Sequence, residues 1–170
     1  MMPVYVGPAT LVNLGTVGET DLLEAFDGPV IIPAAVAAEV TTEPARTNME
    51  KLVADSDARV EPVETDQSDR AQRIVGVDQP VVESRLLEPV LERRDREGGP
   101  EVGIVTEDRR LRTVGEGLGA TVTGTFGVVV RAARGDKYLP TSQAKRIIRR
   151  IDSQGLHLTG ELRAQAIGDL

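Results

Sequence analysis

The stretch from Gly103 to Arg112 combines residue types that could do chemistry. A short apolar run ends at Val105, and Thr106 is followed by two acids and three arginines: Glu107, Asp108, Arg109, Arg110 and Arg112. In α/β proteins, ligands bind outside the carboxyl ends of the strands. Carboxylates at such an edge can hold Mg²⁺ or Mn²⁺, and arginines beside them can hold phosphate. The alternative is that both acids cap the following helix, because acids suit a first helical turn.

Three further acids lie on separate predicted elements. Glu39 is the only charge in an alanine-rich helix that follows Pro33, whereas Glu83 and Glu88 belong to a longer helix after Pro80. Several carboxylates brought to one edge of a sheet would repel one another unless a cation or a proton relieved them. A divalent metal could do so and could activate water against a phosphodiester.

Composition narrows the chemistry further. The chain of 170 residues has no cysteine and one histidine, which excludes thiolate zinc sites and disfavours a Ser-His-Asp triad. His157 is predicted to be a surface or capping residue. No stretch approaches the length of a membrane span, and no secretory signal opens the sequence, so we expect a cytoplasmic protein without membrane contact. Many acids, few lysines and almost no aromatic residues indicate a salt-adapted, halophilic cytosol.

Charge is unevenly distributed along the chain. Residues 1–102 carry 20 acids and 9 bases, whereas residues 103–150 carry 4 acids and 10 bases. The second segment includes a predicted helix with Lys145, Arg146, Arg149 and Arg150 on one side. A basic segment in an acidic protein favours a polyanionic partner such as RNA. The alternative is that these arginines pair with the acidic half of the chain.

Short apolar runs alternate with helical patterns along the sequence. This alternation predicts a three-layer α/β/α domain with a central, mainly parallel sheet and a helical C-terminal tail. We expect residues 1–138 to form the domain and residues 139–170 to form a helical extension packed on it. Residues 64–80 are polar and acidic, and no element is assigned there. Pro89 predicts a kink or break in its helix.

Several segments resemble PIN domains. The segment GETDLLEAFDGPVIIPAAVAAEV looks like the early part of that family, where a strand is followed by a proline and a helix bearing a metal-site acid, here Glu39. GIVTEDRRLR resembles the later PIN strand that ends in an acid, which Asp108 matches best. The tail, from VTGTFGVVVRAARGDKYLP to GLHLTGEL, is similar to the extended C-terminus of a prokaryotic PIN subfamily.

The resemblance implies a ribonuclease that depends on Mg²⁺ or Mn²⁺. It implies Glu39, Glu83 and Asp108 as catalytic residues, with Glu88 and Glu107 as additional metal-ligand candidates. It also implies an RNA substrate, an antitoxin partner and a homodimer formed through residues 33–40 or 126–133. Arginines after Asp108 and the basic helix at 145–150 would contact phosphate.

Two positions depart from the family pattern. Gly7 stands where PIN proteins usually carry an aspartate at the end of the first strand, and Arg85 falls where a second central acid is common. Losing one carboxylate removes a charge and a tether from the metal, although another acid such as Asp21 could compensate.

Three hypotheses follow from these observations. The first is an active metal-dependent ribonuclease. The second is a PIN-like module without catalysis that binds RNA or a protein. The third is a nucleotide-binding α/β protein, but the glycine-rich run at 115–119 does not follow a strand and therefore fails as a phosphate loop.

Overall fold

Five short strands form one sheet, and every strand pair in it is parallel. The structure, a computed structural model, describes residues 1–135, 139–154 and 160–170, with the backbone alone for residues 160–163. The strands are β1 (Val4–Val6), β2 (Val30–Pro33), β3 (Arg59–Glu61), β4 (Gly103–Val105) and β5 (Thr121–Thr123). The prediction of a mainly parallel sheet is confirmed, and the sheet is parallel throughout.

The strand order is β3-β2-β1-β4-β5, so the chain leaves β1 first in one direction and later in the other. Register is set by pairing Val4 with both Val30 and Gly103, and Gly103 with Thr121. The three central strands are buried along their length, as their continuous apolar runs predict. The reversal of direction between β1 and β4 creates the crevice where ligands bind in such sheets.

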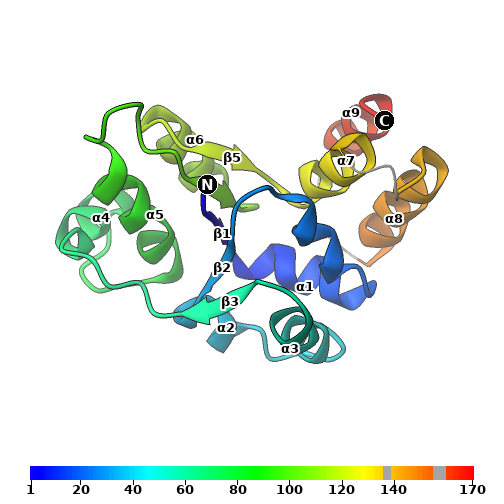
Figure 1. Cartoon of the computed structure of the whole chain (residues 1–170), viewed down its shortest axis with the longest axis horizontal. Coiled ribbons are helices and arrows are strands. Elements are labelled where there is room, and N and C mark those ends of the chain that lie inside the picture. The colour runs from blue at the N-terminus through cyan, green and yellow to red at the C-terminus, as the bar shows by residue number, and fades with distance from the viewer. Residues whose placement is uncertain (136–138, 155–159) are drawn as a thin grey trace.

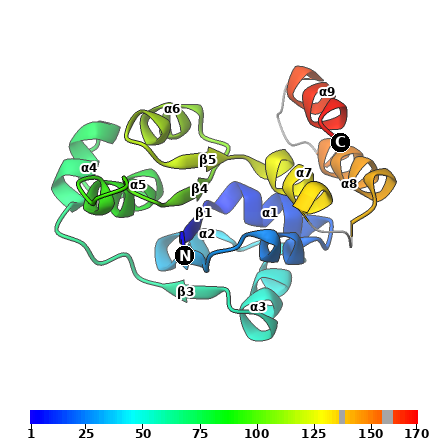
Figure 2. The ribbon, with the colours of Figure 1, turned by 45° about the horizontal axis from the view of Figure 1, so that its top comes forward.

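Helices cover both faces of the sheet. They are α1 (Pro8–Thr16), the 3₁₀ helix η1 (Thr20–Ala25), α2 (Ala34–Glu39), α3 (Ala45–Asp55), α4 (Ser68–Val75), α5 (Val82–Arg93), α6 (Arg109–Gly117), α7 (Thr125–Gly135), α8 (Thr141–Ser153) and α9 (Gly160–Gly168). Figures 1 and 2 show α4, α5 and α6 gathered on one side, with α1, α3, α7, α8 and α9 on the other. The predicted three-layer arrangement with a helical C-terminal segment is confirmed.

Close packing between α1 and α3 depends on a glycine. A Cβ atom on Gly15 would lie 2.7 Å from the Cα of Ala45, closer than real carbon contacts. Asn48 of α3 donates from Nδ2 to the Gly15 carbonyl at 2.8 Å. The two backbones therefore approach each other at a distance that no side chain at position 15 would allow.

Two local features differ from the sequence expectations. Residues 68–75 form the helix α4, which ends at Gly76 in the left-handed conformation that glycine adopts readily. Pro89 does not break α5, which runs without interruption across it. Residues 86–91 of α5 are all buried, so packing against neighbouring elements, α4 above all, holds the helix together despite the missing backbone donor.

The C-terminal segment packs on the body of the domain. Helix α8 contacts α1 and α7 through its buried residues Ala144, Ile147, Ile148 and Ile151. The guanidinium of Arg150 donates to the Val17 carbonyl at 2.9 Å. The division between residues 138 and 139 stays a prediction, and the prediction for His157 lies outside the described residues.

Within the described part of the chain, no helix is both long enough and apolar enough to pass through a lipid bilayer.

Candidate functional site

Gly7 and the turn at residues 106–108 follow β1 and β4, the two strands that border the crevice. The amide of Gly7 donates to the Val105 carbonyl at 2.8 Å, which holds the two strand ends together. Gly7 is buried and has an ordinary extended conformation, with φ −80° and ψ 165°. A Cβ atom at this position would lie 3.2 Å from the Val105 carbonyl oxygen and 3.6 Å from Leu86 Cδ1. A side chain here would therefore point into the crevice at modest steric cost.

Asp108 caps α6. Its Oδ1 accepts a hydrogen bond from the Leu111 amide at 2.7 Å, and its own amide donates to Thr106 Oγ1 at 3.1 Å. Such a cap satisfies a backbone donor that the helix itself leaves free. The capping alternative is therefore confirmed for Asp108, while its second carboxylate oxygen makes no protein hydrogen bond among the described residues.

Glu107 caps a different helix from the one expected. Its Oε1 accepts from the Thr125 amide at 2.5 Å, at the start of α7. The hydroxyl of Thr125 donates to Thr10 Oγ1 at 3.1 Å and accepts from Asn13 Nδ2 at 3.4 Å. Both threonines are fully buried. This network joins the end of β4 to α1 and α7 directly beside the crevice.

Sequence reasoning missed Thr10, Asn13 and Thr125. Thr125 had a usable signal, because it stands between a predicted strand and an apolar helix, where threonine suits a helix start. Thr10 and Asn13 carried none, since their role depends on α1 lying beside α7.

Glu83 and Asp108 come together. Both line one hollow of about 170 Å³, together with Val75, Arg110, Leu111 and Val114. Glu83 lies in the first turn of α5, and Asp108 lies at the start of α6. Arg110 lies on the same wall and donates to the Ile74 carbonyl at 3.3 Å. Two acidic residues and one arginine therefore line the same hollow.

The other two predicted acids lie elsewhere. Glu88 is fully buried in α5, where it accepts from Thr65 Oγ1 at 2.8 Å and from Arg85 Nη1 at 2.9 Å. Glu39 is the last residue of α2 and is exposed. Asp21 lies on η1 near Glu19, whose pKa is raised by burial and further by the charge of Asp21. Arg85, the residue at the second central acid position, thus serves as the partner of Glu88.

The described residues contain no group of three or more acids or histidines arranged to hold a metal ion. Gly7 contributes no ligand atom from a side chain, and one oxygen of each of Glu107 and Asp108 already accepts from a helix amide. Hard divalent cations require several oxygen ligands. The donor set in this part of the chain does not fit a cation held by three protein carboxylates.

The predicted basic residues form two surfaces. Arg109 and Arg110 are exposed at the start of α6, and Arg112 donates to the Thr106 carbonyl at 3.4 Å. Helix α8 carries Lys145, Arg146, Arg149 and Arg150, and Arg150 lies 3.8 Å from the Glu19 carboxylate. Figures 1 and 2 both show α6 and α8 apart from each other, with α7 between them.

A family model described as a PIN domain matches residues 7–170. The chain belongs to the PIN domain family. No protein of curated function and no solved structure matches the chain. In this PIN domain the position that follows β1 is occupied by Gly7, and the acid that follows β4 is present as Asp108. Metal binding by Glu39, Glu83, Glu88, Glu107 and Asp108 stays a prediction.

Proposed function

We propose that this PIN domain binds RNA and lacks efficient metal-dependent cleavage. The observation that carries the proposal is Gly7, which leaves the end of β1 without a carboxylate at the switch point of the sheet. The remaining acids support it, because two of them already cap helices and Glu88 is paired inside the domain. Retention of the fold without the full set of acids fits a binding role.

RNA is the favoured partner because of the charge beside the crevice. None of the described residues forms an ion pair with Arg109, Arg110 or Arg112. They lie near the start of α6, whose amide at Leu111 is already capped by Asp108, so the guanidinium charges are what would attract an anion. Phosphate groups are anions with the geometry that guanidinium groups bind well. The same residues would therefore bind an RNA backbone with little sequence preference.

The decisive experiment restores the missing carboxylate. Gly7→Asp suits the backbone conformation and requires the neighbouring groups to move by only a few tenths of an ångström. We expect the wild type to bind a labelled single-stranded RNA without cleaving it in Mn²⁺. Gly7→Asp should gain a melting temperature that rises with Mn²⁺, together with cleavage. Gly7→Asn, which has the same shape without the charge, should gain neither.

RNA binding itself is tested by charge reversal. Arg109→Glu combined with Arg110→Glu should weaken binding of the labelled RNA at least tenfold, measured by fluorescence anisotropy at fixed salt. Binding that is indifferent to this double substitution would remove RNA from the proposal. Arg146→Glu combined with Arg149→Glu tests the second basic surface in the same assay.

A second candidate function is the metal-dependent ribonuclease itself. It is favoured by one observation, the shared hollow of Glu83 and Asp108, where two carboxylates could hold Mg²⁺ or Mn²⁺. If the wild type cleaves RNA in Mn²⁺, and Glu83→Gln or Asp108→Asn abolishes the cleavage, this candidate replaces the first. Asn caps helices as well as Asp does, so Asp108→Asn removes the charge and keeps the cap.

Membership of the family also supports two finer proposals, and composition supports a third. We infer an antitoxin or other protein partner, a homodimer, and adaptation to a salt-rich cytoplasm. The last rests on composition, with 27 acids against 20 basic residues and a net charge of −7. Sedimentation at several KCl concentrations tests the oligomeric state and the salt requirement together.

A further inference from the structure

Strand β5 is at the edge of the sheet, with β4 on one side and, among the residues that the structure describes, no strand on the other. Its inner side is hydrogen-bonded: the Thr121 amide donates to the Val102 carbonyl at 3.0 Å, and the Thr123 carbonyl accepts from the Thr106 amide at 2.9 Å. Successive residues of a strand direct their backbone groups to opposite sides, so the N–H and C=O of Val122 point away from the sheet. An edge of this kind is a template for another strand.

A groove lies along this edge. Thr121 and Thr123 form its floor, with walls from α7 and the loop that contains Phe26, and its volume is about 650 Å³. It adjoins the hollow lined by Glu107, Arg112 and Gly124, because Thr123, Gly127 and Val130 line both. Together the two hollows extend along the full length of β5.

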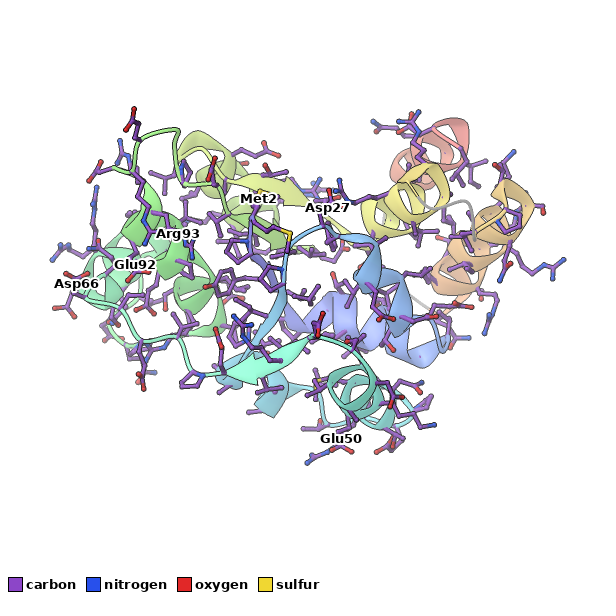
Figure 3. The ribbon with its side chains drawn as sticks, in the orientation of Figure 1. Met2, Asp27, Glu50, Asp66, Glu92 and Arg93 are labelled. Carbon is purple, nitrogen blue, oxygen red and sulfur yellow. The ribbon has the colours of Figure 1, made fainter. Side chains whose placement is uncertain are left out.

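Two arginines line the groove, and neither is held in a strong ion pair by the described residues. Arg131 is 47% exposed and lies over the Phe26 ring at 5.1 Å from its centroid. Its ion pair with Asp27 is long, at 3.7 Å, and the Asp27 side chain is 94% exposed, so the pair contributes little. Figure 3 labels Asp27 beside α7. Arg134 is exposed, and none of the described residues forms an ion pair with it.

The alternation of side chains along β5 indicates which kind of strand could pair with its outer edge. Thr121 and Thr123 face the groove, whereas Val122 packs toward Gly115 of α6 on the other face. A strand added to this edge would alternate in the same way. Every second residue would then face the groove with Arg131 and Arg134, and the residues between would lie on the α6 side.

We propose that the outer edge of β5 binds an extended peptide with acidic residues at alternate positions, as an added strand of the sheet. The backbone of Val122 supplies a donor and an acceptor, Arg131 and Arg134 pair with the acids, and Phe26 supplies an apolar wall. A peptide satisfies both backbone groups, whereas an RNA strand offers no regular match for them. Its charged residues, Arg131 and Arg134, are distinct from Arg109 and Arg110, which are proposed to bind RNA, and Arg112 lines only the adjoining hollow.

The probe is a labelled peptide of alternating valine and glutamate, added to the full chain and followed by fluorescence anisotropy. A peptide of alternating valine and lysine is its matched control and should not bind. Two N-methylated versions of the probe test strand addition without altering the protein. In one version every valine amide is methylated, and in the other every glutamate amide is methylated. Only one of these two sets of amides can face β5 in an added strand. One methylated probe should therefore lose binding, and the other should keep it. Equal behaviour of the two methylated probes would overturn the proposal.

Protein variants give the second readout. Val122→Pro removes the outward N–H and no hydrogen bond of the sheet, and proline is tolerated at such edge positions. We expect at least tenfold weaker binding of the probe to Val122→Pro and to Arg131→Glu combined with Arg134→Glu. Arg149→Glu on α8 should leave binding unchanged. Absence of binding to the wild type, or competitive displacement of the probe by a uridine oligonucleotide, would also contradict the proposal.

Discussion

From the sequence, Glu88 could be either a metal ligand or a structural residue, and its surroundings in the fold favour the structural role. Its carboxylate is fully buried and accepts hydrogen bonds from Thr65 and Arg85, so it joins α5 to the segment that precedes α4. A buried carboxylate is tolerated where it is paired in this way. Its partners therefore account for the burial of this acid without a metal ion.

The first prediction concerns the stability that Glu88 contributes. Glu88→Ala leaves Arg85 and Thr65 without their partner, and removing one member of a buried ion pair costs roughly 3 kcal/mol. Glu88→Gln keeps the shape and the Thr65 hydrogen bond and should cost less. Urea unfolding measures both. Glu92→Ala is the control, since Glu92 is exposed on the same helix and is labelled in Figure 3. Equal losses for Glu88→Ala and Glu92→Ala would show that the pair contributes nothing.

The site could be predicted in part because the relevant signals are local. An apolar run, a threonine and two acids placed Asp108 at the end of a strand, and the parallel topology then placed it at the crevice. The orientations of Glu39 and Glu88 could not be predicted in the same way. They depend on which helix face packs on the sheet, and that is decided by contacts between distant parts of the chain.

At the scale of elements, the continuous apolar runs of β1, β2 and β4 were recognisable in the sequence and predicted a parallel sheet. Helix α4 was not recognisable, because its residues are mostly polar and Ala71 is its one buried residue. Propensity alone is a weak guide, and α4 gains stability mainly by packing on α5. Tertiary contact therefore supplies what the local pattern lacks.

The second prediction concerns the contact between α1 and α3. Gly15→Ala would place a methyl group against the Ala45 backbone, which cannot move as a flexible side chain would. Overpacking of this kind costs about 1–3 kcal/mol. Gly117→Ala is the matched control, because nothing lies within 4 Å of its added Cβ and alanine favours the helix by up to about 1 kcal/mol. The melting temperature should therefore fall for Gly15→Ala and rise for Gly117→Ala. An unchanged melting temperature for Gly15→Ala would mean that the two helices separate easily.

At the scale of the whole molecule, helix α8 of the C-terminal segment is held on the domain by apolar packing and by a charged contact. Arg150 of α8 donates to the carbonyl of Val17, which follows α1, and lies near Glu19, which precedes η1. Burial raises the pKa of Glu19, the charge of Asp21 raises it further, and Arg150 lowers it in part. The folded protein therefore binds this proton more tightly than the unfolded chain does.

The third prediction is a pH dependence with a definite sign. Because the pKa of Glu19 is raised on folding, its contribution to stability is full below the ordinary glutamate value of 4.5 and is lost as pH rises through the folded pKa. Glu19→Gln removes this loss. It also removes the pair with Arg150, whose side chain is 51% exposed and whose atoms lie 3.8 Å from Glu19, and such a pair is worth at most about 1 kcal/mol. Glu19→Gln should therefore be at least as stable as the wild type at pH 7, with a smaller decline in the free energy of unfolding between pH 4 and pH 7. Glu24→Gln, which is exposed on the 3₁₀ helix that follows Glu19, is the control. A Glu19→Gln protein that is clearly less stable at pH 7 would show that the contact with Arg150 outweighs the cost of burying the charge.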